Sequence, residues 1–355
     1  MGSNVREEEE ACLSAMNFVN SSVFPLVLNA AIELDLFGII AKAGPGARAS
    51  ASEIASQLPT NNPKASAMLD RMLHLFATHS LLSCSSRTHE NGRVESVFGL
   101  TPACMYFLGR EEDGNVSGLM TLACHPATLE VWLHLKDLIL EGGNMFEKIK
   151  GMSVFEYMNE DQKFRNIFNR AMCGASTLVM NEILKTYEGF EGISKLVDVG
   201  GGTGRTLQAI ISKYPSIKGI NYDLPHVIQT APHYPGIQHV GGDMFKNVPE
   251  GDAIVLKATI HDWDDESAIK ILNNCYEALP KNGKLMIINE LLPEKPDTSN
   301  ASQYAWKLDN LMLVQPGGKE RNAKQYEALT KAAGFTHFTV ACLTHGVWAV
   351  MESYK

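Results

Sequence analysis

A glycine-rich segment follows an apolar run that ends in an acid. LVDVGGGTG, residues 196–204, has the pattern D-x-G-x-G-x-G, in which Asp198 is followed by Gly200 and Gly202. A glycine turn between a strand and a helix lets a ligand approach the main chain closely. The further Gly or Ala of the dinucleotide fingerprint and the Lys-Ser/Thr pair of a triphosphate loop are both missing. The segment predicts a nucleoside ligand without a pyrophosphate; a tight turn that only packs helix against sheet is the alternative.

Acids also end the next two apolar runs of the chain. Asp223, which Leu224 follows directly in NYDLPH, can accept both hydroxyls of a ribose. Asp243 and Met244 in GGDMF place a carboxylate near an adenine amino group and a thioether on the ring face. Asp198, after the first run, can face an ammonium or sulfonium charge. The three acids together fit S-adenosylmethionine, whose product is S-adenosylhomocysteine.

A histidine follows the apolar run DAIVLKATI. We therefore expect His261 at a strand end, in the same crevice as the cofactor, with Asp262 beside it. Glu290 ends the next strand, KLMIINE, and Glu320 lies in the polar turn PGGKERN. A carboxylate on one imidazole nitrogen fixes the tautomer and leaves the other nitrogen free to take a proton. The alternatives are a histidine packed for structure and a solvated acid in a loop.

The acids in HDWDDE raise the question of a metal site. Asp264, Asp265 and Glu266 directly precede the helical pattern SAIKILNNCYEAL. An N-cap and a first helical turn, both favoured by the helix dipole, explain these acids better than a metal does. We therefore expect no metal.

The elements that position these residues follow from the apolar patterns. After LVDVGGGTG, short apolar runs alternate with helical patterns, which predicts a parallel sheet with crossover helices. FTHFTVACL and GVWAVMESY predict a final antiparallel pair of strands. In the first third, SSVFPLVLNAAIELDLFGII has helical spacing, and Ser50 and Glu53 form a capping box. Two further runs joined at Asn91-Gly92 predict a hairpin, so this part is expected to be a winged-helix-like module.

Composition limits the partners and the compartment. The formal net charge of −9 and the absence of a Lys/Arg cluster argue against nucleic acid, so we expect the winged-helix-like module to self-associate rather than bind DNA. No stretch of 18 uncharged apolar residues occurs, and the acidic N-terminus lacks the apolar segment of a secretory signal. The seven scattered cysteines fit reduced thiols. We expect a cytoplasmic protein without membrane or nucleic-acid partners.

Five ordered segments carry a family resemblance: LVDVGGGTG, NYDLPHVIQTAPHYPGIQHVGGDMF, LKATIHDWDDE, INELLPEKP and PGGKERN. Together they resemble the plant S-adenosylmethionine-dependent small-molecule O-methyltransferases of the caffeic acid type, over essentially the whole chain. The resemblance implies a homodimeric, metal-independent enzyme that methylates a phenolic hydroxyl and whose N-terminal module lends residues to the partner's active site. It also implies that Glu290 and Glu320 flank the base His261, that Lys257 contacts the cofactor and that Asp262 touches a substrate hydroxyl.

Two domains are expected on these grounds. Residues 1–115 should form the mostly helical, winged-helix-like dimerisation domain, and the linker GREEDGNVSG spans its C-terminal boundary. Residues 116–355 should form an α/β, Rossmann-like methyltransferase domain, in which helices at about 119–185 contribute the acceptor pocket.

Energetics decide what kind of base His261 can be. A phenol with a pKa near 10 and an imidazole near 6.5 differ by roughly 3.5 units, so complete proton transfer beforehand would cost about 5 kcal/mol. A nearby sulfonium in a dry pocket lowers this cost. We therefore expect His261 to remove the proton as the oxygen attacks the methyl group in line.

The acceptor pocket is where the chain departs from the family. The resemblance places the acceptor ring against Phe164, Phe168, Met172, Leu311 and Met312. The chain differs from the usual residues at Ala175, Ala258, Gln315 and Leu122-Ala123. We expect a wider pocket with fewer polar anchors, so that a coumarin, flavonoid, monolignol or alkaloid is an alternative to caffeate.

Two rival functions remain open. An N-methyltransferase could use a similar scaffold, but an aromatic amine needs no strong base, so His261 with both glutamates favours oxygen. A non-catalytic dimeric binding protein derived from such an enzyme is the alternative outside enzymology, and the intact set of candidate catalytic residues argues against it.

Overall fold

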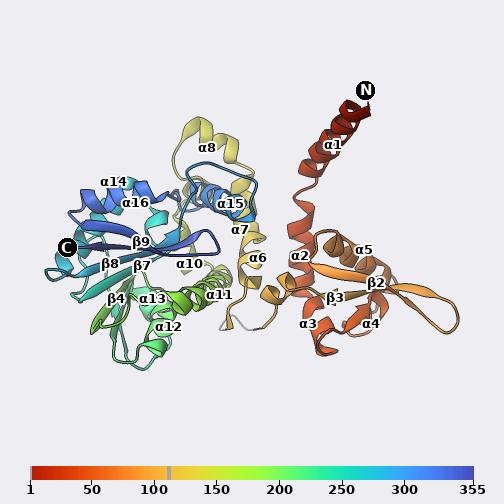
Figure 1. The fold of residues 1–355 in the computed structure, drawn as a ribbon, viewed down its shortest axis with the longest axis horizontal. Coiled ribbons are helices and arrows are strands. Elements are labelled where there is room, and N and C mark those ends of the chain that lie inside the picture. The colour runs from red at the N-terminus through yellow and green to blue at the C-terminus, as the bar shows by residue number, and fades with distance from the viewer. Residues whose placement is uncertain (1, 110–112) are drawn as a thin grey trace. The chain divides into compact units, whose positions relative to one another are not determined.

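The computed structural model describes residues 2–109 and 113–355 and divides the chain into two compact units, residues 1–125 and 126–355 (Figure 1). The division falls later than the predicted boundary at 115/116, because helix α6 (Ser117–Ala123) makes its contacts with α2 (Val23–Glu33) of the first unit. Within the linker GREEDGNVSG, residues 110–112 lie outside the described part of the chain.

The first unit combines helices with a three-stranded antiparallel sheet in the order β1-β3-β2. The strands are β1 (Arg48–Ser50), β2 (Leu82–Thr88) and β3 (Val94–Leu100). The other elements are α1 (Gly2–Val19), α3 (Leu36–Lys42), α4 (Ala51–Ala55), α5 (Ala65–Thr78) and the 3-10 helix η1 (Ala103–Phe107), besides α2 and α6. Helices packed on a small hairpin sheet agree with the predicted winged-helix-like module.

Local sequence signals explain several of these elements. Ser50 caps α4 and forms the predicted capping box with Glu53. The hairpin between β2 and β3 turns at Gly92, whose φ of 79° suits glycine. The predicted helix SSVFPLVLNAAIELDLFGII is divided into α2 and α3 at Asp35, which takes the left-handed conformation with φ 52°. Helix α1 carried no recognised signal and is an addition to the prediction.

No single described helix is long and apolar enough to cross a membrane, although residues 6–19 and 23–33, a pair bent by 49°, reach the required length and composition together.

The second unit is built on a seven-stranded sheet in the order β6-β5-β4-β7-β8-β10-β9. The first five of these strands are parallel, and β10 runs antiparallel to both of its neighbours. The strands are β4 (Lys195–Val199), β5 (Lys218–Asp223), β6 (Ile237–Gly241), β7 (Ala253–Lys257), β8 (Lys284–Glu290), β9 (Thr336–Thr344) and β10 (Trp348–Tyr354). The parallel sheet and the final antiparallel pair are both as predicted.

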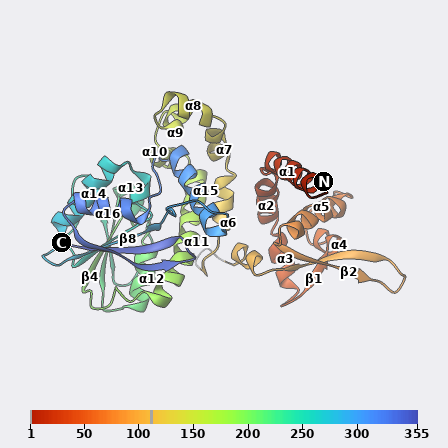
Figure 2. The same ribbon diagram turned by 45° about the horizontal axis from the view of Figure 1, so that its top comes forward.

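Helices cover both faces of this sheet (Figures 1 and 2). Alternate strand residues point to opposite faces, so Val197 packs with α14 (Asp265–Ala278) and α16 (Ala323–Ala332), whereas Leu196 packs with the other face. The other face is covered by α11 (Gln162–Thr186), α12 (Arg205–Lys213) and α15 (Asn300–Val314). The core of the unit therefore lies in two layers, one on each side of the sheet.

The predicted helical stretch from about 119 to 185 is interrupted. It contains α6, α7 (Pro126–Trp132), α8 (Leu135–Glu141), α9 (Met145–Lys150), α10 (Val154–Glu160) and the long α11. Gly142 ends α8 and Gly151 ends α9, each with a positive φ that most other residues avoid. Within the second unit, both views show α7 to α10 grouped beside the sheet.

Candidate active site

The carboxyl ends of the parallel strands surround a cavity of about 570 Å³. Such a crevice is where α/β proteins of this type bind ligands. The cavity is lined by six of the residues to which the sequence assigned a cofactor or substrate role, namely Gly200, Asp223, Leu224, Asp243, Met244 and Asp262. Residues of α9 and α10 that the sequence argument missed, including Glu147, Phe155 and Glu156, line another part of it.

The glycine-rich turn follows β4 and leads into α12, as predicted. Gly200 has a φ of 71°, and a Cβ there would lie 2.9 Å from the side chain of Thr259. A Cβ at Gly201 would collide with the side chain of Asn221. The close approach of the main chain to these neighbours therefore requires glycine.

Asp198 carries a buried carboxylate without a hydrogen-bond partner. Its side chain is 1% exposed, and neither of its oxygens meets a donor among the described residues. Burial raises the pKa of Asp198 to about 7; the charge of Lys257 acts in the opposite direction, and that of Asp223 adds to the rise. Because an unpaired buried carboxylate is costly, this group suits a positively charged part of a ligand.

Asp223 and Asp243 stand at the ends of β5 and β6. The carboxylate of Asp223 accepts the main-chain N–H groups of Gly202 at 2.8 Å and Leu224 at 2.7 Å. Burial raises the pKa of Asp223 despite these two bonds, which act to lower it. Asp243 accepts the N–H of Phe245 at 2.9 Å. Both carboxylates also line the cavity, as a role in holding a ribose and an adenine requires.

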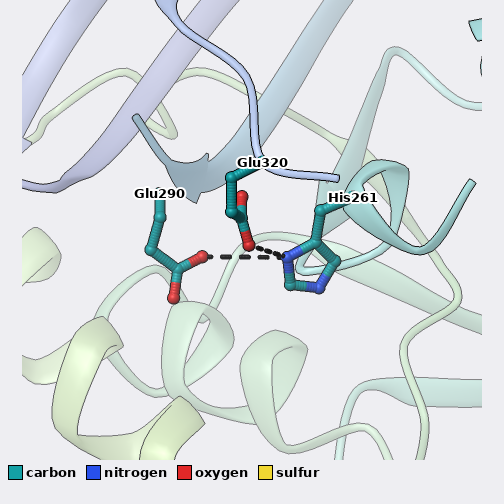
Figure 3. Close-up of side chains that lie close together, drawn as sticks. All are labelled: His261, Glu290 and Glu320. Carbon is teal, nitrogen blue, oxygen red and sulfur yellow. Dashed lines mark hydrogen bonds and ion pairs between the residues drawn. The ribbon is translucent and has the colours of Figure 1, made fainter. Parts of the chain in front are cut away.

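His261 meets two glutamates in the interior of the second unit (Figure 3). It lies in the short 3-10 helix η3 (Ile260–Asp262) that follows β7, and it is 8% exposed. Its Nδ1 is 2.5 Å from Oε1 of Glu320 and 4.0 Å from Oε2 of Glu290. Its Nε2 lies 3.7 Å from Oδ1 of Asp262, a residue that lines the cavity. Nδ1 is thus held by the carboxylate of Glu320, and Nε2 faces Asp262.

Glu320 is itself held in place by groups that the sequence argument missed. Asn289, the residue before Glu290 on β8, donates its side-chain N–H to Oε2 of Glu320 at 3.1 Å. The main-chain N–H of Glu320 donates to Asp309 at 2.9 Å. The only signal for Asn289 was an amide within the apolar run KLMIINE. Both oxygens of Glu320 therefore have fixed partners.

Charges around His261 change its acid strength. Burial lowers the pKa of His261, but the carboxylates of Glu320, Asp262 and Glu290 outweigh this effect and raise the pKa to about 10. Burial and the charge of Glu320 raise the pKa of Glu290 to about 8. Burial likewise raises the pKa of Asp262 to about 6. The neighbouring carboxylates therefore shift the pKa of His261 from that of an ordinary imidazole toward that of a phenol.

Lys257 ends β7 between the glycine-rich turn and the glutamates. Its ammonium lies 5.3 Å from the ring centre of Trp348. Burial lowers the pKa of Lys257, and the charges of Glu290 and Asp198 act to raise it. The side chain is half-buried rather than an exposed cation at a strand end.

The residues expected to grip an acceptor ring lie on α11 and α15. Phe164 is fully buried, and its ring packs against Tyr157 at 5.3 Å between centres, which is a core contact. The five residues in this group do not belong to the described lining of the cavity: Phe164, Phe168, Met172, Leu311 and Met312. Ala258, one of the departures from the family, does line it.

The acids of HDWDDE have structural partners. Asp264 caps α14 by accepting the N–H of Ser267 at 2.7 Å, as predicted. Asp265 binds Arg321 at 2.8 Å and Lys319 at 2.8 Å. Ligand atoms of His261, Glu290 and Glu320 lie within 4.8 Å of one another, close enough to share a metal ion. The short bond between His261 and Glu320 equally suits a shared proton.

Comparisons with known proteins agree with this geometry. Residues 132–336 match the model of the O-methyltransferase domain, and residues 16–110 match that of the O-methyltransferase dimerisation domain. A caffeic acid 3-O-methyltransferase of Catharanthus roseus is 51% identical over 99% of this chain and 97% of its own length. O-methyltransferase 13 of Lophophora williamsii is 53% identical over 98% and 96%.

Solved structures extend the similarity to the fold. Human N-acetylserotonin methyltransferase, determined in complex with SAM, has a TM-score of 0.82 and 22% identity, with 97% of each chain covered. At this identity the likeness concerns the fold alone. The family models and the close relatives together show that the chain belongs to the O-methyltransferases that carry a dimerisation domain and a Rossmann-like catalytic domain.

Proposed function

We propose that the protein transfers the methyl group of S-adenosylmethionine to a phenolic hydroxyl of a small phenylpropanoid-like acceptor, with His261 as the general base. The observation that carries this proposal is the buried imidazole whose Nδ1 is bound by Glu320 and whose Nε2 is on the side of a cavity-lining residue. Relatives named as caffeic acid 3-O-methyltransferases support the phenolic acceptor.

The strand ends fit the cofactor. Asp198 offers its unpartnered carboxylate to a positive group, Asp223 has a carboxylate at the cavity for two ribose hydroxyls, and Met244 lies beside Asp243 at the cavity for an adenine. Gly200 and Gly202 keep the main chain open to the ligand, and we infer that Lys257 completes the site with its charge. When bound, S-adenosylmethionine supplies an activated methyl group on a positive sulfur.

The residues around His261 hold and move one proton. With a pKa raised to about 10, the ring of the free protein is protonated at neutral pH, so it must lose this proton before it can act as a base. Loss of the proton is easier when a second positive charge is bound in the neighbouring cavity, because like charges repel. The neutral ring then takes the phenolic proton on Nε2, and Glu320 stabilises the resulting cation from Nδ1.

The raised pKa of His261 moves the energetic cost from the proton transfer itself to the earlier loss of the ring proton. A base and a phenol of nearly equal pKa exchange a proton at little cost, whereas an ordinary imidazole would face a gap of roughly 3.5 units. Positioning of the two substrates then supplies most of the acceleration. An acceptor nitrogen would need no such base, so oxygen is preferred to nitrogen.

Fewer residues are assigned to holding the acceptor than to binding the cofactor and moving the proton. We propose that Asp262 contacts an acceptor hydroxyl, since it lines the cavity beside Nε2 of His261. We propose Phe164, Phe168, Met172, Leu311 and Met312 as the acceptor contacts, as the family resemblance implies. Ala258 widens the cavity where a larger side chain would narrow it. A bulkier phenol such as a coumarin, flavonoid or alkaloid therefore competes with caffeate.

Assembly and compartment complete the proposal. The dimerisation domain at residues 16–110 supports a homodimer, in which the first unit of one protomer lends residues to the active site of its partner. The seven cysteines are scattered along the chain and form no C-x-x-C pair, which fits the reducing cytoplasm.

The decisive experiment is a turnover assay with methyl-labelled cofactor and a panel of catechols, guaiacols, coumarins and phenolic alkaloids. His261→Asn should abolish methyl transfer while S-adenosylhomocysteine still binds, measured by calorimetry. Parental turnover by this variant would overturn the role of His261, and binding of phenols without any turnover would instead support a non-catalytic binding protein.

A further inference from the structure

Arg321 places a buried guanidinium next to the candidate catalytic residues. The side chain is 1% exposed. Its Nη1 donates to the carbonyl oxygen of Ile260 at 3.1 Å, and its Nη2 donates to that of Trp263 at 2.7 Å. Nε and Nη2 also bind one carboxylate oxygen of Asp265, at 3.0 and 2.8 Å. A buried charge is tolerated only with such complete pairing.

Two of the three carbonyls that Arg321 binds stand on either side of His261, and the third is that of Lys319, 3.4 Å from Nη1. Ile260 precedes the histidine directly, and Trp263 follows Asp262. One planar guanidinium therefore holds both ends of the turn that presents the imidazole. Lysine could not do the same, because its ammonium is a point charge without the fork of N–H groups that spans several acceptors.

The main chain around Arg321 is joined to the other two acids. Residue 321 directly follows Glu320 and forms a bridge with Leu291, the residue after Glu290. Its carbonyl oxygen accepts the N–H of Leu292 at 3.1 Å. The segments that carry His261, Glu290 and Glu320 thus meet at this one arginine.

We propose that Arg321 is a positioning residue that sets the distance and angle between His261 and its two glutamates. The inference rests on the proposed role of His261 as the base. In this view the guanidinium does not touch the acceptor or the cofactor. It fixes the η3 turn so that Nδ1 of His261 stays against Glu320, and it thereby maintains both the direction of Nε2 and the raised basicity of the ring. A displacement of about 1 Å at such a site costs on the order of 100-fold in rate.

The test compares Arg321→Lys with the parental protein. We expect kcat to fall about 100-fold, while the Kd for S-adenosylhomocysteine stays within about threefold, because Asp198, Asp223 and Asp243 lie at the ends of other strands. The pH of half-maximal kcat should also move down. In the variant His261 lies farther from Glu320, so the carboxylate raises the pKa of the ring by a smaller amount. A purely structural role would lower the melting temperature without moving that pH.

Controls separate positioning from folding. Lys324→Met removes a nearby cation that pairs with the exposed Glu294, 2.7 Å away, and should leave kcat and the pH profile unchanged. Rates are expressed per cofactor site titrated by calorimetry, so a partly unfolded sample does not mimic the effect. Arg321→Gln is a second variant. It removes the buried charge altogether, so its effect on the free energy of unfolding differs from that of Arg321→Lys.

The outcomes are distinct. Either Arg321 variant that binds S-adenosylhomocysteine normally and keeps both the parental kcat and the parental pH profile overturns the proposal. Parental activity of His261→Asn would instead overturn the proposed base, and with it the reason for positioning the ring.

Discussion

Asn289 donates to one carboxylate oxygen of Glu320 at 3.1 Å, while the other oxygen lies 2.5 Å from Nδ1 of His261. The neutral amide of Asn289 thus holds Oε2 of the carboxylate and keeps Oε1 oriented toward the imidazole. A hydrogen bond to a charged group contributes about 1.5 to 3 kcal/mol, so this amide is expected to matter for the whole cluster.

Asn289→Ala should lower kcat about tenfold or more, because Glu320 loses the partner that orients it. Steady-state assays with the best acceptor measure the change. Asn310→Ala is the matched control, since this exposed amide of α15 donates to the carbonyl oxygen of Trp306 in its own helix. Equal losses in both variants would contradict the assigned role.

Glu320→Gln tests the origin of the strong base. The charge of Glu320 is the largest of the influences that raise the pKa of His261, so its removal should lower that pKa. Because only the neutral ring accepts a proton, the parental kcat/KM should still rise with pH above 7, and the rise should shift to lower pH in the variant. The maximal rate should fall about 100-fold, as expected when a general base is weakened. A profile of unchanged shape would argue against the pairing.

Asp198→Asn tests the cofactor site with two opposite readouts. The variant should bind S-adenosylhomocysteine about 10- to 100-fold more weakly, because a charged partner is lost. The ligand-free protein should nevertheless melt at a higher temperature. The folded protein raises the pKa of Asp198 to about 7, so this acid destabilises the fold increasingly as the pH rises from the pKa of the unfolded chain to the pKa of the folded protein. The gain should therefore be larger at pH 8 than at pH 5. A gain of equal size at both pH values would contradict this account.

Treatment with a chelator should leave the rate unchanged. A metal at the triad would have to displace the hydrogen bond between His261 and Glu320 and would remove the nitrogen that orients the base. Activity is measured before and after dialysis against the chelator, with magnesium, manganese and zinc added back separately. A loss that one of these ions restores would replace the proposed mechanism with a metal-assisted one.

Much of the fold could be predicted because it depends on local patterns. The apolar runs gave the parallel strands, and Ser50 with Glu53 identified the start of α4 correctly. The interrupted helices between 119 and 185 were missed because glycines at 142 and 151 end elements whose helical spacing continues across them. Helix α1 carries four consecutive glutamates, and its apolar residues lie almost all in its second half, so no apolar spacing runs along its whole length.

The site could be predicted only in part, for a different reason. The apolar runs of the sequence point to His261, Glu290 and the acids at the strand ends. The residues that hold these side chains in place come from distant segments. Asn289 and Arg321 act across the fold, through contacts that no spacing in the sequence reveals. The pKa of His261 likewise depends on how closely three carboxylates approach it, which only the folded structure shows.

Gly318 has a consequence for protein engineering. A Cβ at this position would collide with the carbonyl oxygen of His261, and Gly317 before it has a φ of 79°. A mutant library aimed at new acceptors can therefore vary Gln315 and the cavity-lining Pro316, but it should stop short of the two glycines. Substitutions at these two glycines are expected to disrupt the turn that carries His261 and not to alter acceptor selectivity.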